Sequence, residues 1–321
     1  MSQLNMVCLE DLVDADHIYR KFLELWSLDS VMAHLYDVEN DSNYKGYGVL
    51  RLFKCLLLQF MEDLSDRELE RFLKENNAGK WFCEFDLTET NPTHTVFTRA
   101  RERIGTERLA MIFNELRDQL KAQGYINEVF SFVDASQLMS KAALWKERDN
   151  AIKKKYEKLN NEILPKVAHD TQARIGCKGK DKFWYGYKKH VCVDMQDGFI
   201  NKVAITPANT TDAQGLKHVC PDQGAIFADK AYCVKPATDA ATRKGCHLAA
   251  IKKNNMKGKN KDKDHWYSKM RAPYERVFSQ QNKRVRYCGI KKNQFTAFME
   301  SICFNLKRLV VLDSLRMQQG S

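Results

Sequence analysis

The chain has 321 residues, of which 44% are hydrophobic and 29% charged, with only 15 Gly and 6 Pro. This composition excludes a wholly disordered or collagen-like chain, and the length is typical of about two domains. No apolar segment reaches the roughly 20 residues of a membrane span, and the first residues lack the basic start of a secretory signal, so we expect a cytoplasmic protein with no membrane partner.

The chain contains 10 cysteines, and none of them stands in a CxxC pair. In a cytoplasmic protein this pattern favours reduced, mostly buried thiols over a disulfide scaffold. A zinc site stays open as an alternative, because His218 lies near Cys220 and His247 lies beside Cys246.

Charge is distributed unevenly along the chain. Residues 1–130 contain 15 Lys and Arg against 23 Asp and Glu, whereas the remaining residues contain 37 against 18. A concentrated positive charge attracts phosphate backbones and releases their counterions. We therefore expect a nucleic-acid partner for the second part of the chain; the alternative is a solvated basic surface that aids solubility.

Residues 1–125 show the apolar spacing of helices and form a predicted all-helical N-terminal domain. A buried helix is expected over 47–61, and Ser65 and Glu68 fit a capping box that starts the next helix. Two more helices are expected around 96–103 and from Thr106 to about Gly124. This order loosely resembles a helix-turn-helix unit that binds DNA ends, and an ordinary helical bundle fits it equally.

From residue 126 short apolar strands and helices predict a mixed α/β domain over 126–316. Strands are expected at 129–133, 190–194, 199–206, 225–228 and 247–251, and the second and third form a hairpin through the turn at 197–198. Helices are expected at 239–244, from about Pro273, and at 294–312. A basic helical or irregular insertion is expected at 141–181, and a basic loop at 252–263.

Three carboxylates occupy positions that suit chemistry. Asp134 and Asp229 each end a predicted strand, and Glu275 falls in the first turn of the helix expected to start near Pro273. Three carboxylates in one site repel one another unless a cation neutralises them, and oxygen ligands suit Mg²⁺ or Mn²⁺. The spacing alone is weak support, since a single acid at a strand end is also a common turn cap.

The amino-acid sequences of five segments resemble those of the insertion-sequence DDE transposases, specifically the insertion-sequence-five family within the larger IS4-like group. These segments are Phe132–Ser136, Phe183–Asp194, Val203–Asp212, Ala228–Tyr232 and Arg271 with Tyr274–Phe278. They stand in family order over residues 128–312. Residues 64–69 also resemble the helical domain that these enzymes carry. The resemblance implies a ribonuclease H-like fold with Asp134, Asp229 and Glu275 as catalytic residues that bind two Mg²⁺ ions, or Mn²⁺ in their place.

The resemblance also implies residues that contact DNA. Tyr267 and Lys283 each lie one position beyond the usual spacing of the family's tyrosine and lysine. The expected contacts are Arg271, Arg276, Lys283, Lys230, Tyr232, Lys188, Arg99 and Arg103. Two alternatives stay open: Arg99, Arg101 and Arg103 also fit a helix-surface ion network, and the aromatic cluster at 183–187 fits core packing better than base stacking. His190 fits a structural histidine better than a cleft residue.

The implied activity is metal-dependent phosphoryl transfer on DNA. Water attacks at the element ends, and the freed 3′-hydroxyl then attacks target DNA. The implied partners are double-stranded DNA, at the terminal inverted repeats and the target, and a second copy of the chain in the synaptic complex. DNA binding would bring the protein to the bacterial nucleoid. Two alternatives are an inactive or domesticated relative that binds DNA without cutting it, and a metal-dependent nuclease on the same fold.

Overall fold

A computed structural model describes residues 8–41, 46–140, 165, 168–179, 182–275, 277 and 283–319. The chain forms two compact units, one of residues 1–116 and 299–321 and the other of residues 117–298. No helix in the described ranges is long and apolar enough to cross a membrane.

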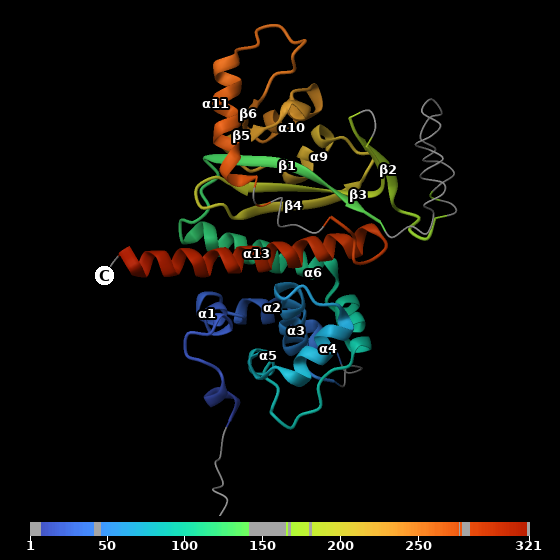
Figure 1. Cartoon of the computed structure of the whole chain (residues 1–321), viewed down its shortest axis with the longest axis vertical. Coiled ribbons are helices and arrows are strands. Elements are labelled where there is room, and N and C mark those ends of the chain that lie inside the picture. Colours follow the sequence, from blue (N-terminus) through green and yellow to red (C-terminus); the bar gives the residue numbers. More distant parts are fainter. Residues whose placement is uncertain are drawn as a thin grey trace, which may run out of the picture. The chain divides into compact units, whose positions relative to one another are not determined.

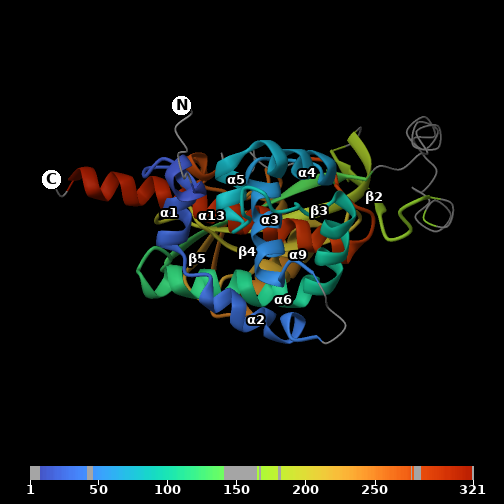
Figure 2. The same ribbon diagram turned by 90° about the horizontal axis from the view of Figure 1, so that it is seen from below.

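The first unit is helical. Its elements are η1 (Leu9–Leu12), α1 (Ile18–Leu25), α2 (Asp29–Glu39), α3 (Val49–Met61), α4 (Asp66–Glu75), α5 (Asn77–Phe82), the first part of α6 (His94–Ala122) and the last part of α13 (Ile290–Gln319). In α3, 11 of 13 residues are buried, and Figure 2 shows this helix between α2 and the α4–α5 pair. The apolar spacing over 47–61 therefore marks the central helix of the unit.

Two sequence-level predictions for this unit are confirmed. Ser65 caps α4: its hydroxyl accepts the Glu68 N–H at 3.3 Å, and the Glu68 carboxylate accepts the Ser65 N–H at 2.7 Å. The helices expected on either side of residue 105 are separated by Gly105, whose φ of 71° breaks α6 there. A positive φ costs an L-residue energy that glycine does not pay, so the helical pattern is interrupted at this residue.

The second unit contains a six-stranded mixed sheet. Its elements are β1 (Phe130–Met139), β2 (Arg174–Lys178), β3 (Lys182–Asp194), β4 (Ile200–Pro207), α9 (Asp212–Val219), β5 (Ala225–Ala228), η2 (Lys230–Tyr232), α10 (Lys235–Arg243), β6 (His247–Ala250), α11 (Lys261–Arg271) and η3 (Ala272–Tyr274). The strand order is β2-β3-β1-β5-β6, with β4 also paired to β3. The β3–β4 hairpin is confirmed, and so are the strands at 225–228 and 247–250. The mixed α/β class is confirmed as well.

Alternating side chains of the central strands enter two separate cores. Val133 and Ile226 pack with α9 and α10, whereas their neighbours Phe132 and Phe227 pack with α11. Successive side chains of a strand point to opposite faces, so the two cores cover the two faces of the sheet. Figure 1 shows α11 beside the β5–β6 end of the sheet.

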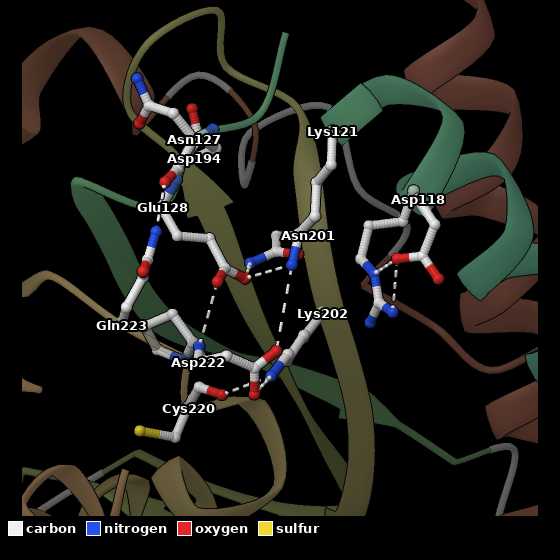
Figure 3. A network of polar contacts seen from close by, with 12 residues as sticks. Asp118, Lys121, Asn127, Glu128, Asp194, Asn201, Lys202, Cys220, Asp222 and Gln223 are labelled. Carbon is white, nitrogen blue, oxygen red and sulfur yellow. Dashed lines mark hydrogen bonds and ion pairs between the residues drawn. The ribbon is translucent and has the colours of Figure 1, made fainter. Parts of the chain in front are cut away.

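A buried polar network holds the start of β1 (Figure 3). The Glu128 carboxylate accepts hydrogen bonds from Asn201 at 2.5 Å and from the Asp222 N–H at 3.2 Å, and it pairs with Lys121 at 3.0 Å. The Asp194 carboxylate accepts the Glu128 N–H at 2.8 Å. Burial raises the pKa of Asp194, and these bonds oppose that effect. The network therefore ties the N-terminal end of β1 to β3, β4 and the segment before β5.

Two expectations about elements are wrong, and a third lies mostly outside the described residues. β1 does not end at Asp134 but continues to Met139, because β3 pairs with it along its whole length from Ser131. Most of the helix expected from about Pro273 lies outside the described residues; α11 precedes it in the chain, and Asn260 accepts the Lys263 N–H at 3.0 Å and caps α11. The end of the predicted insertion forms a strand, β2, although most of 141–181 lies outside the described residues.

Candidate active site at the edge between two parallel strands

The register of the sheet places Asp134 and Asp229 at matching positions. Each paired residue of β1 lies beside the β5 residue 95 positions later, as in Phe132 with Phe227. The same offset leads from Asp134 to Asp229. Neighbouring strands are about 4.8 Å apart, and matched residues of parallel strands point to the same face. Both aspartates lie just beyond the point where β1 and β5 stop pairing, close enough for the Asp229 charge to act on Asp134.

The environment of Asp134 disfavours its charge. The side chain is half-buried, and its Oδ1 accepts the Ala135 N–H at 2.8 Å. Burial raises the pKa of Asp134 to about 6, with a further rise from the Asp229 charge and a smaller opposing effect of Arg271. Burial and the second acid disfavour the ionised form of this carboxyl, and a bound cation would favour it.

Asp229 ends β5 and begins a short 3₁₀ helix. Its Oδ1 accepts the Ala231 N–H at 2.7 Å, so it caps η2. Each aspartate thus has one oxygen bonded to a backbone N–H, which orients the carboxylate and leaves its charge in place. The turn-cap role and a functional role therefore coexist at Asp229. Lys230, the next residue, is exposed.

Glu275 forms an ion pair with Arg271, whose charge also acts on Asp134. The Arg271 Nη2 lies 3.5 Å from the Glu275 Oε1, and the guanidinium lies over the Phe132 ring at 5.3 Å from its centroid. Arg271 is buried at the end of α11, whereas the Glu275 side chain is 60% exposed. Glu275 directly follows η3, and most of the helix in whose first turn it was expected lies outside the described residues. The structure therefore brings two of the three predicted carboxylates together.

The residues of the site fit a divalent cation in their chemistry. Among the described residues, no three His, Cys, Asp or Glu side chains lie close enough to hold a metal ion together. Paired aspartate oxygens nevertheless suit Mg²⁺ and Mn²⁺. Two buried donor atoms, the Tyr232 hydroxyl and the Arg271 Nε, have no hydrogen-bond partner within the described ranges. Buried donors without an acceptor are rare in native proteins, and a charged oxygen atom that enters the site would accept their hydrogen bonds.

An acid that the sequence-level prediction did not select, Asp212, lies at the start of α9. Lys188 on β3 pairs with its Oδ1 at 2.7 Å. The Asp212 charge contributes to the raised pKa of Asp134. A local signal did exist, because Thr211 and Gln214 have capping-box spacing, and the Thr211 hydroxyl accepts the Gln214 N–H at 3.3 Å.

His190 lies on the face of the sheet that α9 covers. It is fully buried, and its Nε2 lies 2.8 Å from the Thr206 hydroxyl. Burial lowers the pKa of His190 to about 4. A Cβ atom on Gly215 of α9 would come within 2.1 Å of the imidazole. The structural interpretation of His190 is therefore confirmed: the ring fills the space that the missing side chain of Gly215 leaves.

The aromatic cluster at 183–187 also belongs to the core. Trp184, Tyr185 and Tyr187 are buried. The Tyr187 hydroxyl donates to the Asp170 Oδ1 at 2.6 Å, and the Tyr185 hydroxyl donates to the Asp170 carbonyl at 2.6 Å. Core packing, rather than base stacking, is confirmed for these three residues. Tyr267, considered for the family's tyrosine, is likewise a core residue of α11.

The predicted DNA contacts are distributed over both units. In the second unit, Lys283 is exposed and its carbonyl accepts the Met139 N–H at 2.9 Å, while Tyr232 is buried. Arg276 lies outside the described residues. In the helical unit, Arg99 and Arg103 are exposed on α6. Arg101 forms a two-bond ion pair with Asp66, at 2.8 and 2.5 Å, and this pair joins α6 to α4.

Comparisons with known proteins match two parts of the chain. Residues 7–103 match a family model described as a transposase domain (DUF772), and residues 163–307 match one described as a transposase DDE domain. None of the curated proteins and none of the solved structures compared with the chain matches it. The second match contains Asp229 and Glu275, and the two together support an insertion-sequence DDE transposase.

Proposed function

We propose that this chain, with its two transposase domain matches, is an active DNA transposase that cleaves DNA at the ends of its element and joins them to target DNA. The observation that carries the proposal is the parallel register of β1 and β5, which leads towards Asp134 on one strand and Asp229 directly after the other. The strand order β4-β3-β1-β5-β6, with β1 antiparallel to β3 and parallel to β5, supports a ribonuclease H-like fold. We assign the chain to the insertion-sequence-five family because of the five sequence motifs that resemble it.

In this proposal Asp134, Asp229 and Glu275 hold two Mg²⁺ or Mn²⁺ ions. When bound, the ions supply charge neutralisation and activation of an attacking hydroxyl. Glu275 is exposed and pairs with Arg271. To join the aspartates when the site assembles, its carboxylate would turn away from the arginine. Arg271 is then released to bind a phosphate, for which its planar guanidinium offers two parallel hydrogen bonds.

The basic residues serve the DNA backbone in the same proposal. Lys230 follows Asp229 directly and is exposed, so it is placed to contact a phosphate near the aspartates. Lys283 and Arg276 follow Glu275 in the chain, and Lys188 lies beside Asp212. Arg99 and Arg103 supply exposed positive charge on the helical unit. Contacts of this kind fix the register of the protein on the duplex without reading its sequence. A second copy of the chain holds the other element end.

The test is a transposition assay with a matched control. A marker gene is flanked by the DNA that borders this gene in its source, and the protein is supplied in trans as wild type, Asp229→Asn or Asp239→Asn. Asp239 is an exposed acid on α10 of the same unit. We expect marker movement with the wild type and Asp239→Asn, and none with Asp229→Asn. Equal movement with Asp229→Asn would remove the catalytic assignment.

Two other outcomes of the same assay select other functions. If no marker moves while the wild type still retards the flanking DNA in a gel, the protein is a DNA-binding relative without the activity. If cleavage at the ends is detected without joined products, it is a nuclease. Both outcomes leave the fold assignment in place, because a fold does not fix an activity.

A further inference from the structure

Tyr232 is a buried side chain whose hydroxyl has no partner. The residue is 0% exposed, and the hydroxyl forms no hydrogen bond within the described part of the chain. Its ring packs in the core formed with α9 and α10, so the side chain is fixed in place. Leaving a buried hydroxyl unpaired is costly, and a phenylalanine would fill the same space without that cost.

The charges of the acids of the site act on the Tyr232 phenol. Tyr232 ends η2, the short helix that Asp229 caps, so its position is fixed relative to this aspartate. Burial raises the pKa of the Tyr232 phenol, and the charges of Asp134, Asp212 and Asp229 raise it further. Asp212 already pairs with Lys188 at 2.7 Å. Asp134 and Asp229 each use one oxygen for a backbone N–H, and the phenol is a neutral donor at the end of the short helix that Asp229 caps.

We propose that Tyr232 is a positioning residue that donates its phenolic hydrogen to a carboxylate of the Asp134–Asp229 pair when a divalent cation binds there. The inference rests on the proposed function, since it requires the cation. A cation needs both carboxylates ionised and fixed, although they repel each other when they are alone. A phenol fixes a carboxylate without neutralising it, whereas a lysine such as Lys188 would compete with the cation for the charge.

A contact between Tyr232 and DNA bases does not fit this position. The side chain is fully buried, and base stacking needs an exposed ring face. A purely structural role would require a hydrogen bond in the folded protein, and the hydroxyl has none among the described residues. Tyr187 is the contrasting case, because it is equally buried and its hydroxyl donates to Asp170 at 2.6 Å.

The experiment compares Tyr232→Phe with Tyr187→Phe in the full chain. Thermal unfolding is followed without metal and during titration with MnCl₂ alone, for the wild type, both variants and Asp229→Asn. For Tyr232→Phe we expect a metal-free melting temperature equal to or above that of the wild type. We also expect the Mn²⁺ concentration that gives half of the thermal shift to rise about tenfold, as the loss of one charge-assisted hydrogen bond predicts. For Tyr187→Phe we expect a metal-free melting temperature below that of the wild type and an unchanged Mn²⁺ concentration at half of the thermal shift.

Each outcome decides one of the two ideas. A Tyr232→Phe variant that needs no more Mn²⁺ than the wild type, or that loses stability without metal as Tyr187→Phe does, would overturn the inference and leave the proposed function standing. If the wild type shows no Mn²⁺-dependent shift that Asp229→Asn abolishes, the cation site itself is wrong, and the role of Tyr232 falls with it.

Discussion

Replacement of Asp134 by asparagine should stabilise the metal-free protein at neutral pH. Asparagine has nearly the same shape as aspartate and carries no charge at any pH. In the folded chain burial and the neighbouring Asp229 raise the pKa of Asp134 from 3.8 to about 6. The fold therefore disfavours the ionised carboxylate, and the substitution removes that cost. Under the proposed function the ionised carboxylate would be kept at this cost in stability because activity requires it.

The magnitude follows from linkage between protonation and folding. A pKa of about 6 in the folded state and 3.8 in the unfolded state corresponds to at most about 3 kcal/mol. Below pH 3.8 the carboxyl is protonated in both states, so the variant and the wild type should be equally stable. Between pH 3.8 and 6 the free energy of unfolding of the wild type falls relative to that of the variant, and above pH 6 this difference is complete. Asp134→Asn should therefore exceed the wild type by up to about 3 kcal/mol at pH 8.

Chemical denaturation in EDTA at pH 4 and pH 8 measures this difference. The matched control is Asp239→Asn, an exposed position on α10 where water hydrates the carboxylate in both states, and its unfolding free energy should follow the wild type at both pH values. An Asp134→Asn variant that is less stable than the wild type at pH 8, or that gains equally at both pH values, would refute the electrostatic reasoning.

Two further substitutions test the packing of the second unit. Gly215→Ala should destabilise the protein by roughly 1–3 kcal/mol, because its Cβ would lie 2.1 Å from the His190 ring, and His190→Ala in the same chain should restore part of the loss. Glu128→Leu should cost about 3–5 kcal/mol, since it leaves Lys121 and Asn201 without their buried acceptor, while Glu128→Gln should cost less. Urea denaturation measures both; a Gly215→Ala loss unchanged by His190→Ala, or equal losses for the two Glu128 variants, would contradict them.

Local signals in the sequence predicted much of the fold. The hairpin at 190–206 has a turn signal between two apolar runs, and Ser65 has its glutamate three residues later, so each could be recognised within a few residues. Strand ends were harder to predict. After Asp134 the strand continues through Ala135, Ser136 and Gln137, which carry no apolar pattern. Their extended conformation comes from pairing with β3, which lies about 50 residues away.

The candidate site could be recognised from the sequence only where a strand leads to it. Asp134 and Asp229 lie in or beside apolar strands, which pair in parallel up to Phe132 and Phe227. The spacing of 95 residues between them has no meaning in the sequence until β1 and β5 are known to be neighbours. The capping-box spacing around Asp212 indicates only a helix start, and its pairing with Lys188, 24 positions earlier on another element, is visible only in the structure. The Tyr232 hydroxyl shows its lack of a partner only in three dimensions.

Glu275 differs physically from the two aspartates. The sheet and backbone N–H groups fix Asp134 and Asp229, whereas Glu275 follows a 3₁₀ turn and its exposed side chain has Arg271 as a neighbour at 3.5 Å. Arg271 also lies close enough to lower the pKa of Asp134. A single guanidinium thus interacts with acids of both kinds. In the proposed function, Asp134, Asp229 and Glu275 would hold the cation that balances their charge, and Arg271 would then be available to bind a phosphate.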